Sequence, residues 1–550
     1  MLNFSREKLM FGLILFGFGL LIAKAFYVQV VQSSFLESEA NKRQIRTLEV
    51  AAPRGQILDR HGELLALSTP VASVWVDPRT LVNHPQAIEE LARVLNLSQQ
   101  QLTRRIQANP NRRFLYIERS ILPDLAKQIE ALRLPGVNIQ AEFKRYYPTA
   151  DIAAHILGYT NIDDIGQDGV ELIYENWLKG QPGRQQIIKD LEGRVVKFVN
   201  NLADAQPGQA LQLSIDKDIQ FFVHRALKEV MTKHQARGAS AVILDAKTGE
   251  ILALVNQPGY NPNNRNQLQG EAIRNRAISE LIEPGSTIKP FVVAKALDLG
   301  LIQADEVINT SPGYIRVQGH MISDAVNYGR LTIGEVIQKS SNVATANIVR
   351  RMSAEQQWRF YSDLGFSQDL GLFLPGEQLG RLRHHREWQL IDQVSSSFGY
   401  GFSTNVMQLA QAYLVFANQG NLPPVSLIKR DAPPEMKSVL SAQAVEQTLQ
   451  MMETVTHQGG TGTEARIEGY RVAGKTGTVL KAGVGGYQEA TYRAMFVGLV
   501  PASRPDMVMA IMVDEPSRGV YGGGSVAAPV FQEVMRHALR LRNVDPDGAL

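Results

Sequence analysis

The stretch EPGSTIKPFVVAKALDLG, residues 283–300, decides how the fold of this sequence is interpreted. Pro284 and Gly285 predict a turn, and the apolar run Phe291–Leu299 predicts a helix that stops before the following glycine. Pro290 is compatible with this helix because it falls in the first turn, where backbone N–H groups have no intrahelical partner. The stretch therefore predicts a tight turn that leads directly into a buried helix.

Ser286 and Lys289 form a Ser-x-x-Lys pair in this stretch. Three residues along a helix bring the amine within one turn of the hydroxyl, and the positive end of the helix dipole favours negative charge that develops during nucleophilic attack. The same spacing also occurs at Ser5/Lys8, Ser214/Lys217 and Ser426/Lys429. Only Ser286 follows a turn and opens an apolar helix, so it is the candidate nucleophile for acyl transfer.

A lysine acts as a base only when its amine is neutral. Lowering its pKa from about 10.4 toward 7 takes roughly 4–5 kcal/mol of desolvation and like-charge repulsion. A second cation nearby would help, and two Lys-Thr-Gly tripeptides in the sequence could supply one.

The tripeptide Lys475, Thr476 and Gly477 continues into Thr478 and follows residues that favour a strand. A glycine inside a strand suits the close approach of another backbone, as when a peptide pairs along a sheet edge. The rival tripeptide at Lys247–Gly249 lies between two β-rich runs, where Thr-Gly is ordinary turn chemistry. We therefore interpret the rival as structural.

A polar Ser-x-Asn loop between helices would complete the set, and Ser340–Asn342 is the candidate. It follows a helix that opens with Thr332-x-x-Glu335, a capping-box pattern. The rival Ser403–Asn405 is interpreted as the N-cap of the helix Val406–Phe416. Three motifs in this order, each in a suitable local context, indicate an active site for acyl transfer by an activated serine.

Composition and charge exclude several classes of protein. A chain of 550 residues is longer than one domain usually is, which predicts several structural units. With 44% hydrophobic and 20% charged residues, the composition excludes a disordered, collagenous or polytopic membrane chain. The net charge of +3 disfavours nucleic acid as a partner, and the absence of cysteine excludes disulfides, thiolate metal ligands and a cysteine nucleophile.

An uncharged apolar run, Leu9–Ala23, predicts a membrane segment. A cleaved signal peptide is the alternative, because small residues flank Lys24, but no polar spacer separates the apolar run from that cut site. We therefore predict an uncut transmembrane anchor at residues 9–30 and a cytoplasmic tail at residues 1–8, since the preceding basic residues favour the inside. Everything from about Gln32 onward is expected to be exported.

A domain boundary is predicted at Gln206–Gly208, which separates a membrane-proximal region, residues 31–205, from residues 206–550. The second region holds strand pairs near both of its ends, within 241–255 and 495–513, with helices between them. This arrangement predicts an α+β domain rather than repeated βαβ units.

Six segments together resemble the monofunctional class B penicillin-binding proteins, and most closely the division-specific members. The resemblance covers nearly the whole chain, including the N-terminal anchor, and its Ser-x-x-Lys and Lys-Thr-Gly motifs are the family signature, with Ser-Ser-Asn here in place of Ser-Asp-Asn. The segments are RGQILDRHGELLA from Arg54, GVELIYENWLKGQPG from Gly169, EPGSTIKP from Glu283, KSSN from Lys339, GKTGT from Gly474 and YGGGSVAAPVF from Tyr521.

The resemblance implies an α+β fold with one transmembrane helix. Residues 206–550 would form a penicillin-binding, serine β-lactamase-like transpeptidase domain, an antiparallel sheet with helices on both faces. Residues 31–205 would form an elongated mixed α/β pedestal of the penicillin-binding protein dimerisation type.

The resemblance also implies catalytic roles. Ser286 would attack the penultimate D-alanine of a peptidoglycan stem peptide and form an acyl-enzyme that an amine of a neighbouring stem peptide resolves. Lys289 would be the base, Ser340 the proton relay to the leaving amine, and Lys475 would keep Lys289 neutral.

Substrate-binding roles are implied for the remaining motif residues. Asn342 would bind the substrate amide, and Thr476 and Thr478 the terminal carboxylate, with Gly477 between them on the same strand. Backbone N–H groups of Ser286 and Thr478 would form the oxyanion hole.

The implied partners follow from the same resemblance. They are stem peptides on glycan strands derived from lipid II, β-lactams as covalent inhibitors, a membrane glycosyltransferase of the FtsW type and other divisome proteins, with no nucleic acid, metal or organic cofactor. A separate polymerase is expected because residues 206–550 are accounted for by one transpeptidase domain. The implied location is the bacterial inner membrane, single-pass, with the catalytic domain in the periplasm.

Three alternatives stay open at this point. A D,D-carboxypeptidase or β-lactamase would share the motifs and transfer the acyl group to water. An elongation-type transpeptidase would share the chemistry, and a non-catalytic divisome scaffold would not need Ser286.

Overall fold

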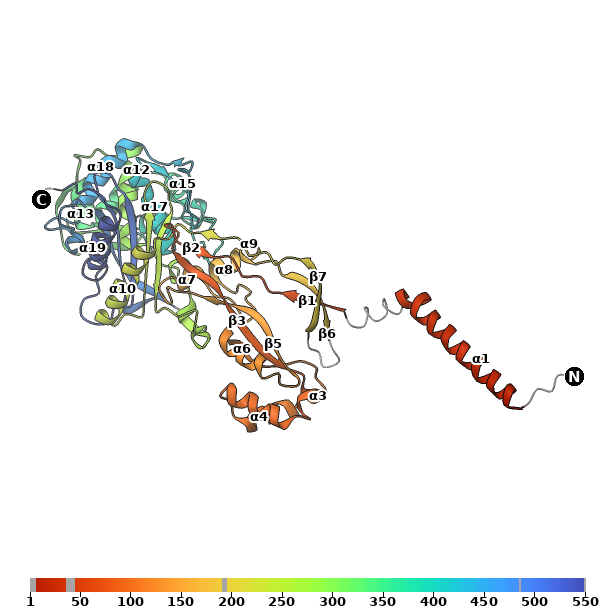
Figure 1. Ribbon diagram of the computed structural model, residues 1–550. Helices are drawn as coiled ribbons and strands as arrows, with labels where there is room; N and C mark the ends of the chain where they lie inside the picture. The colour runs from red at the N-terminus through yellow and green to blue at the C-terminus, as the bar shows by residue number, and fades with distance from the viewer. Residues whose placement is uncertain (1–5, 36–44, 190–194, 484–485, 549–550) are drawn as a thin grey trace. The chain divides into compact units, whose positions relative to one another are not determined.

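The computed structural model describes residues 6–35, 45–189, 195–483 and 486–548 (Figure 1). It contains two compact units that interleave along the chain. The smaller unit comprises Met1–Arg54, Thr69–Lys144 and Gly180–Gly208, and the larger unit comprises Gly55–Ser68, Arg145–Lys179 and Gln209–Leu550. Two segments that precede residue 205 thus pack with the larger unit, and the division of the chain at 205/206 stays a prediction.

The N-terminal apolar run forms helix α1 (Arg6–Phe26), which ends in a π-helical turn, η1 (Tyr27–Val31). Lys8–Val31 has a mean hydropathy of 2.2 over 24 residues, so it is long and apolar enough to cross a membrane. This helix fits the anchor predicted at residues 9–30. Residues 1–5 of the predicted tail, which include Ser5 of the first Ser-x-x-Lys match, lie outside the described residues.

The smaller unit contains two antiparallel sheets. One has the order β1-β6-β7, and in the other β3 pairs with β4 and β5. Helices α3 to α6 bury residues such as Leu91 and Ile106 against Val74 of β3. The bounds are β1 (Ile45–Val50), β3 (Leu64–Val76), α3 (Pro78–Leu81), α4 (Pro85–Val94), α5 (Gln99–Gln107), β4 (Leu115–Ile121), α6 (Pro123–Ala131), β5 (Val137–Tyr146), β6 (Gly183–Lys189) and β7 (Val195–Ala203).

The larger unit is built on a five-stranded antiparallel sheet with the order β10-β9-β19-β18-β17 (Figure 1). Both hairpins predicted from the sequence are present, β9 with β10 and β18 with β19. β17, which carries the Lys-Thr-Gly motif, lies at one edge of the sheet. The strands are β9 (Gly238–Asp245), β10 (Ile251–Gln257), β17 (Ala473–Gly483), β18 (Gly486–Val500) and β19 (Met507–Asp514).

Helices cover both faces of this sheet, as the resemblance implied (Figure 1). α10 (Lys217–His234) and α19 (Gly523–Leu541) pack on one face, and α17 (Val406–Ala417) packs on the other. Successive residues of β9 therefore point into different cores: Val242 belongs to one apolar cluster and Ile243 to the other. Burial on both faces explains why these strands are continuous apolar runs rather than alternating ones.

The remaining elements of the larger unit surround the sheet or extend it. They are β2 (Ile57–Leu58), α7 (Ala154–Leu157), α8 (Gly169–Ile173), α9 (Glu175–Leu178), β8 (Leu211–Gln212), α11 (Arg276–Ser279), α12 (Lys289–Asp298), β11 (Val307–Asn309), β12 (Tyr314–Val317), β13 (His320–Ser323), β14 (Arg330–Thr332), α13 (Ile333–Lys339), α14 (Asn342–Val349), α15 (Ala354–Asp363), α16 (Leu390–Ser397), β15 (Asn421–Leu422), β16 (Lys437–Ser438) and α18 (Ala442–Glu453).

A buried ion pair fixes the segments that join the larger unit from earlier in the chain. Arg145 Nε donates to Glu171 Oε1 at 2.6 Å, and the two side chains are 1% and 0% exposed. Arg145 Nη1 also donates to the carbonyl of Gly55 at 2.8 Å. One guanidinium thus ties the two earlier segments of the larger unit to each other.

We expect Glu171→Ala to lower the free energy of unfolding by about 3–5 kcal/mol, because it leaves the Arg145 charge buried without its carboxylate. Urea denaturation followed by tryptophan fluorescence measures this loss. The control is Glu355→Ala, which removes an exposed partner of Arg359 and should cost at most about 1 kcal/mol. Equal losses for the two variants would contradict the role of the buried pair.

Candidate active site

Ser286 lies in a 3₁₀ turn, η4 (Gly285–Ile288), that leads into α12. The sequence predicted Ser286 at the helix N-terminus, and the structure places it one turn earlier, with Pro290 in the first turn of the helix as expected. Gly285 has φ of +54°, and a Cβ there would lie 2.2 Å from Val479 Cγ1. Only glycine allows this turn to press so closely on β17.

Lys289 is completely buried and joins the first two motifs. Its Nζ lies 2.6 Å from the carbonyl oxygen of Ser340, 3.1 Å from Ser340 Oγ and 2.7 Å from Asn342 Oδ1. The structure therefore brings the Ser-x-x-Lys and Ser-x-Asn residues into direct contact.

The Ser-x-Asn loop is a sharp bend between α13 and α14. Ser340 adopts a left-handed conformation with φ of +61°, which costs an L-residue about 1–2 kcal/mol. The capping box of Thr332 and Glu335 is confirmed at the start of α13. The rival motif is structural as predicted, because Asn405 Oδ1 accepts from the N–H of Gln408 at 2.8 Å and caps α17.

The Lys-Thr-Gly motif lies on the edge strand, and Lys475 is buried there as completely as Lys289. Gly477 leaves room for the Ser286 turn, because a Cβ at this position would lie 2.9 Å from Thr287 Cγ2. Thr478 is exposed and sits one residue before Val479, which contacts the same turn. The Ser286 turn therefore packs against the Lys-Thr-Gly strand, and the Ser-x-Asn loop joins the site through Lys289.

The hydroxyls of the motif are held by segments far away in sequence. Thr476 Oγ1 donates to Thr461 Oγ1 at 2.8 Å, and Thr478 Oγ1 accepts from the N–H of Gly523 at 2.9 Å. Gly523 starts α19, and a Cβ on it would lie 2.4 Å from the carbonyl oxygen of Gly477. The glycines of the YGGGSVAAPVF segment therefore let a helix terminus pack directly against the motif.

The other matches that lie within the described residues are structural. Ser214 Oγ donates to the carbonyl of Ile251 at 2.8 Å, and Ser426 Oγ donates to that of Ile428 at 2.7 Å. In the rival Lys-Thr-Gly, Asp245 Oδ1 accepts from the N–H of Lys247 at 3.0 Å and fixes the hairpin turn, as predicted.

Burial sets the protonation of the two lysines. It lowers the pKa of Lys289 well below its ordinary value, the positive charge of Lys475 lowers that pKa further, and the negative charge of Asp324 opposes both. Burial also lowers the pKa of Lys475 to about 7. The like-charge effect expected of Lys475 is thus present, but desolvation is the larger cause.

Asp324 is a residue of the site that the sequence analysis missed. Its carboxylate accepts from Ser341 Oγ at 2.6 Å and from the N–H groups of Asn342 and Val343 at 2.5 and 3.1 Å. It therefore caps α14 from outside the helix and orients Asn342. Nothing in the local pattern indicates this role, because β14 and α13 lie between Asp324 and the loop that it contacts. The sequence analysis also missed Thr461, which accepts from Thr476 Oγ1 across 15 residues of chain.

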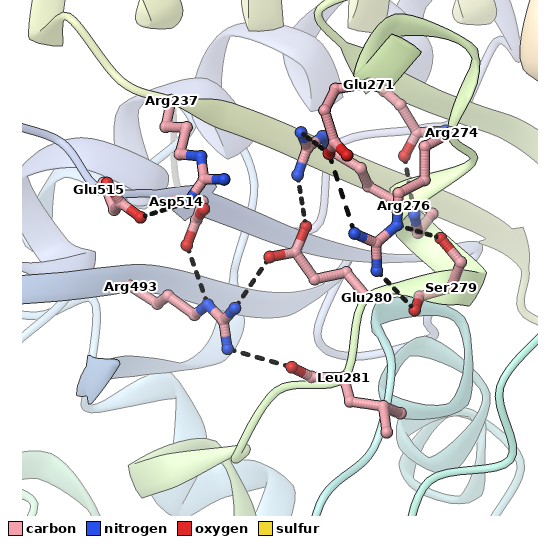
Figure 2. A network of polar contacts seen from close by, with 12 residues as sticks. Arg237, Glu271, Arg274, Arg276, Ser279, Glu280, Leu281, Arg493, Asp514 and Glu515 are labelled. Atoms are coloured by element: carbon pink, nitrogen blue, oxygen red, sulfur yellow. Dashed lines mark hydrogen bonds and ion pairs between the residues drawn. The ribbon is translucent and has the colours of Figure 1, made fainter. Parts of the chain in front are cut away.

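Charged side chains fix the segment that leads to Ser286 (Figure 2). Arg493, on β18, donates to Glu280 at 2.8 Å, to Asp514 at 2.9 Å and to the carbonyl of Leu281 at 3.1 Å. Figure 2 shows its guanidinium between the two carboxylates, with Leu281 below. The chain just before the catalytic turn is thereby tied to the central sheet.

Two domain families match the sequence. Residues 239–536 match the penicillin binding protein transpeptidase domain, and residues 49–213 match the penicillin-binding protein dimerisation domain. The chain belongs to the penicillin-binding protein family. The resemblance to class B members is therefore confirmed, and with it the fold class implied by the sequence.

Individual relatives of this penicillin-binding protein cover almost its whole length. Peptidoglycan D,D-transpeptidase FtsI of Escherichia coli strain K12 is 39% identical over 99% of this chain and 93% of its own. Probable peptidoglycan D,D-transpeptidase PbpC of Pseudomonas aeruginosa is 38% identical over 95% and 92%. A crystal structure of a peptidoglycan synthetase from Bifidobacterium adolescentis, 26% identical, covers 92% of this chain and 98% of its own, with a TM-score of 0.73.

We expect Asp324→Asn to move the acid limb of the pH profile for covalent penicillin labelling to lower pH, because loss of the negative charge lowers the pKa of Lys289 further. The plateau rate should fall about tenfold, since hydrogen bonds to a charged acceptor at α14 are weakened. The rate of covalent labelling by a fluorescent penicillin, measured over a range of pH, reports both effects. Asp363→Asn removes a charge from an exposed pair with Lys437 and should leave the profile unchanged.

Lys475→Met should move the same acid limb in the opposite direction, to higher pH, because removing a positive charge raises the pKa of Lys289. Methionine keeps most of the buried volume of the lysine side chain. The shift of the acid limb is therefore due to the lost charge and not to a rearrangement of the site. Labelling under identical conditions provides the comparison. Shifts of the same sign in the two variants would contradict the electrostatic balance at Lys289.

Proposed function

We propose that this chain cross-links peptidoglycan stem peptides by serine acyl transfer, as a D,D-transpeptidase. The observation that carries the proposal is the buried amine of Lys289, which contacts Ser340 and Asn342 one turn from Ser286. The names and full-length similarity of its relatives support the same activity.

In the acylation step, neutral Lys289 takes the proton of Ser286 Oγ as that oxygen attacks the carbonyl of the penultimate D-alanine. The tetrahedral oxyanion is held by the N–H groups of Ser286 and Thr478, each contributing about 2.7–4 kcal/mol in such sites. Ser340 Oγ, 3.1 Å from Lys289 Nζ, relays the proton to the leaving amine of the terminal D-alanine. The C–N bond breaks, and the ester to Ser286 remains.

The substrate lies along β17, whose position at the sheet edge leaves it able to pair with a peptide. Thr476 and Thr478 bind the terminal carboxylate, and Asn342 binds the amide of the peptide. Gly477 lets the two backbones approach closely. These assignments follow the order of the motif along the strand.

In the second step, an amine of a neighbouring stem peptide attacks the ester carbonyl. Lys289 and Ser340 accept its proton and return it to Ser286 Oγ, so the enzyme is restored as the cross-link forms. β-Lactams mimic the donor and leave an acyl-enzyme.

The cellular role that we propose is septal cell-wall synthesis, supported by the FtsI relatives. Residues 1–8 would lie in the cytoplasm, residues 9–30 would span the inner membrane, and residues 31–205 and 206–550 would form a pedestal and a transpeptidase domain in the periplasm. A glycosyltransferase of the FtsW type, within the divisome, would supply the glycan strands.

Intact mass spectrometry of the protein from Gln32 onward, after addition of benzylpenicillin, tests the nucleophile. We expect a long-lived adduct on the wild type and none on Ser286→Ala. An adduct that disappears within seconds would favour a hydrolase, and the absence of an adduct on both forms would overturn the catalytic proposal.

A further inference from the structure

A pocket of about 560 Å³ opens beside the catalytic turn in the larger unit. Its walls are residues 281–283, which precede Ser286, residues 479–480, which continue β17 beyond Thr478, and residues 401–403. The pocket therefore lies next to the path that we propose for the substrate along β17, between this strand and the segment that precedes Ser286.

Three arginine side chains line this pocket. Arg493 is neutralised by Glu280 and Asp514 (Figure 2), and Arg383 pairs with Asp392 at 2.5 Å. Arg381 differs from both, because it is exposed and forms no ion pair with any residue that the structure describes.

The backbone of Arg381 is nevertheless fixed. Its N–H donates to the carbonyl of Ser403 at 2.9 Å, and its carbonyl accepts from the N–H of Ser403 at 3.0 Å. Glu283 is the carboxylate of the lining, and its Oε1 accepts from the N–H of Gly401 at 2.9 Å. The pocket thus offers a guanidinium on a fixed backbone, with no ion-pair partner among the residues that the structure describes.

The proposed function fixes the direction in which a donor peptide runs past this pocket. Its terminal carboxylate lies at Thr476 and its scissile carbonyl at the N–H of Thr478, so the preceding residues run toward Leu480. A strand advances about 3.3 Å per residue, which brings the residue before the penultimate D-alanine level with the pocket.

We propose that this pocket binds a carboxylate on the side chain of that residue, with Arg381 as its partner. The proposal rests on the proposed function, because the direction of the donor comes from it. A guanidinium suits the task, since its planar donors match both oxygens of a carboxylate. Arg381 would thus select donors by the charge of the residue that precedes D-alanyl-D-alanine.

Two matched peptides test the proposal on the full chain in detergent. One is Nα-acetyl-L-2-aminopimelyl-D-alanyl-D-alanine and the other is Nα-acetyl-L-lysyl-D-alanyl-D-alanine, so that four methylenes carry a carboxylate in the first and an ammonium in the second. The measurement is the concentration of each peptide that halves the rate of labelling of Ser286 by fluorescent penicillin. We expect the aminopimelyl peptide to protect at a concentration about tenfold lower, the factor that corresponds to 1.4 kcal/mol.

Variants then assign the preference to one residue. Arg381→Gln should abolish the preference, measured for each variant relative to its own rate of penicillin labelling without peptide, and Arg381→Lys should retain part of it. Arg504→Gln, which removes an exposed arginine outside the pocket, is the control and should behave as the wild type.

The outcomes separate this proposal from the proposed function. Labelling of Ser286 without a preference between the peptides, or a preference that survives in Arg381→Gln, would overturn the role of the pocket and leave the transpeptidase in place. Absence of labelling at Ser286 would overturn the proposed function and this proposal with it.

Discussion

The active site depends on the burial of one amine. Lys289 contacts three oxygens, which would favour its charged form, yet burial and the charge of Lys475 lower its pKa well below the ordinary value. A neutral amine has two N–H groups, which can donate hydrogen bonds to the carbonyl of Ser340 and to Oδ1 of Asn342. Its lone pair is then left for a hydroxyl, so the same contacts that hold the amine also direct its basic side toward Ser340 or Ser286.

Two charges of opposite sign shift the pKa of this amine in opposite directions. Lys475 reaches it from the edge strand and Asp324 from the segment before α13. Because Asp324 also caps α14 through the N–H groups of Asn342 and Val343, the carboxylate that raises the pKa of Lys289 is the one that orients Asn342. Protonation and geometry at this site are therefore coupled through a single side chain.

The sequence was sufficient to predict the features that depend on residues close together in the chain. Local features could be predicted, because turn residues, hydrophobic periodicity and motif spacing each depend on only a few neighbouring residues. They are the turn at Gly285, the helix after it, both hairpins and the three motifs. Asp324, Thr461 and the pocket around Arg381 could not be predicted, because their contacts join residues of different elements that are 15 or more positions apart in the chain. The 3₁₀ turn that carries Ser286 also escaped prediction, since the approach of Val479 rather than helix propensity shapes it.

The edge strand β17 links catalysis to selection of the substrate. Gly285 allows the catalytic turn to press on it, and Gly523 allows the start of α19 to do the same. An edge strand held in this way presents Thr478 at a fixed position, while the next residues, Val479 and Leu480, form a wall of the arginine-lined pocket. Under the proposed function, a peptide that pairs with this strand cannot shift by one residue without losing the carboxylate contacts that we propose at Thr476 and Thr478. The register that would place the scissile carbonyl at Ser286 is then the register that would place the preceding side chain at the pocket, so the proposed chemistry and the proposed charge selection depend on the same backbone.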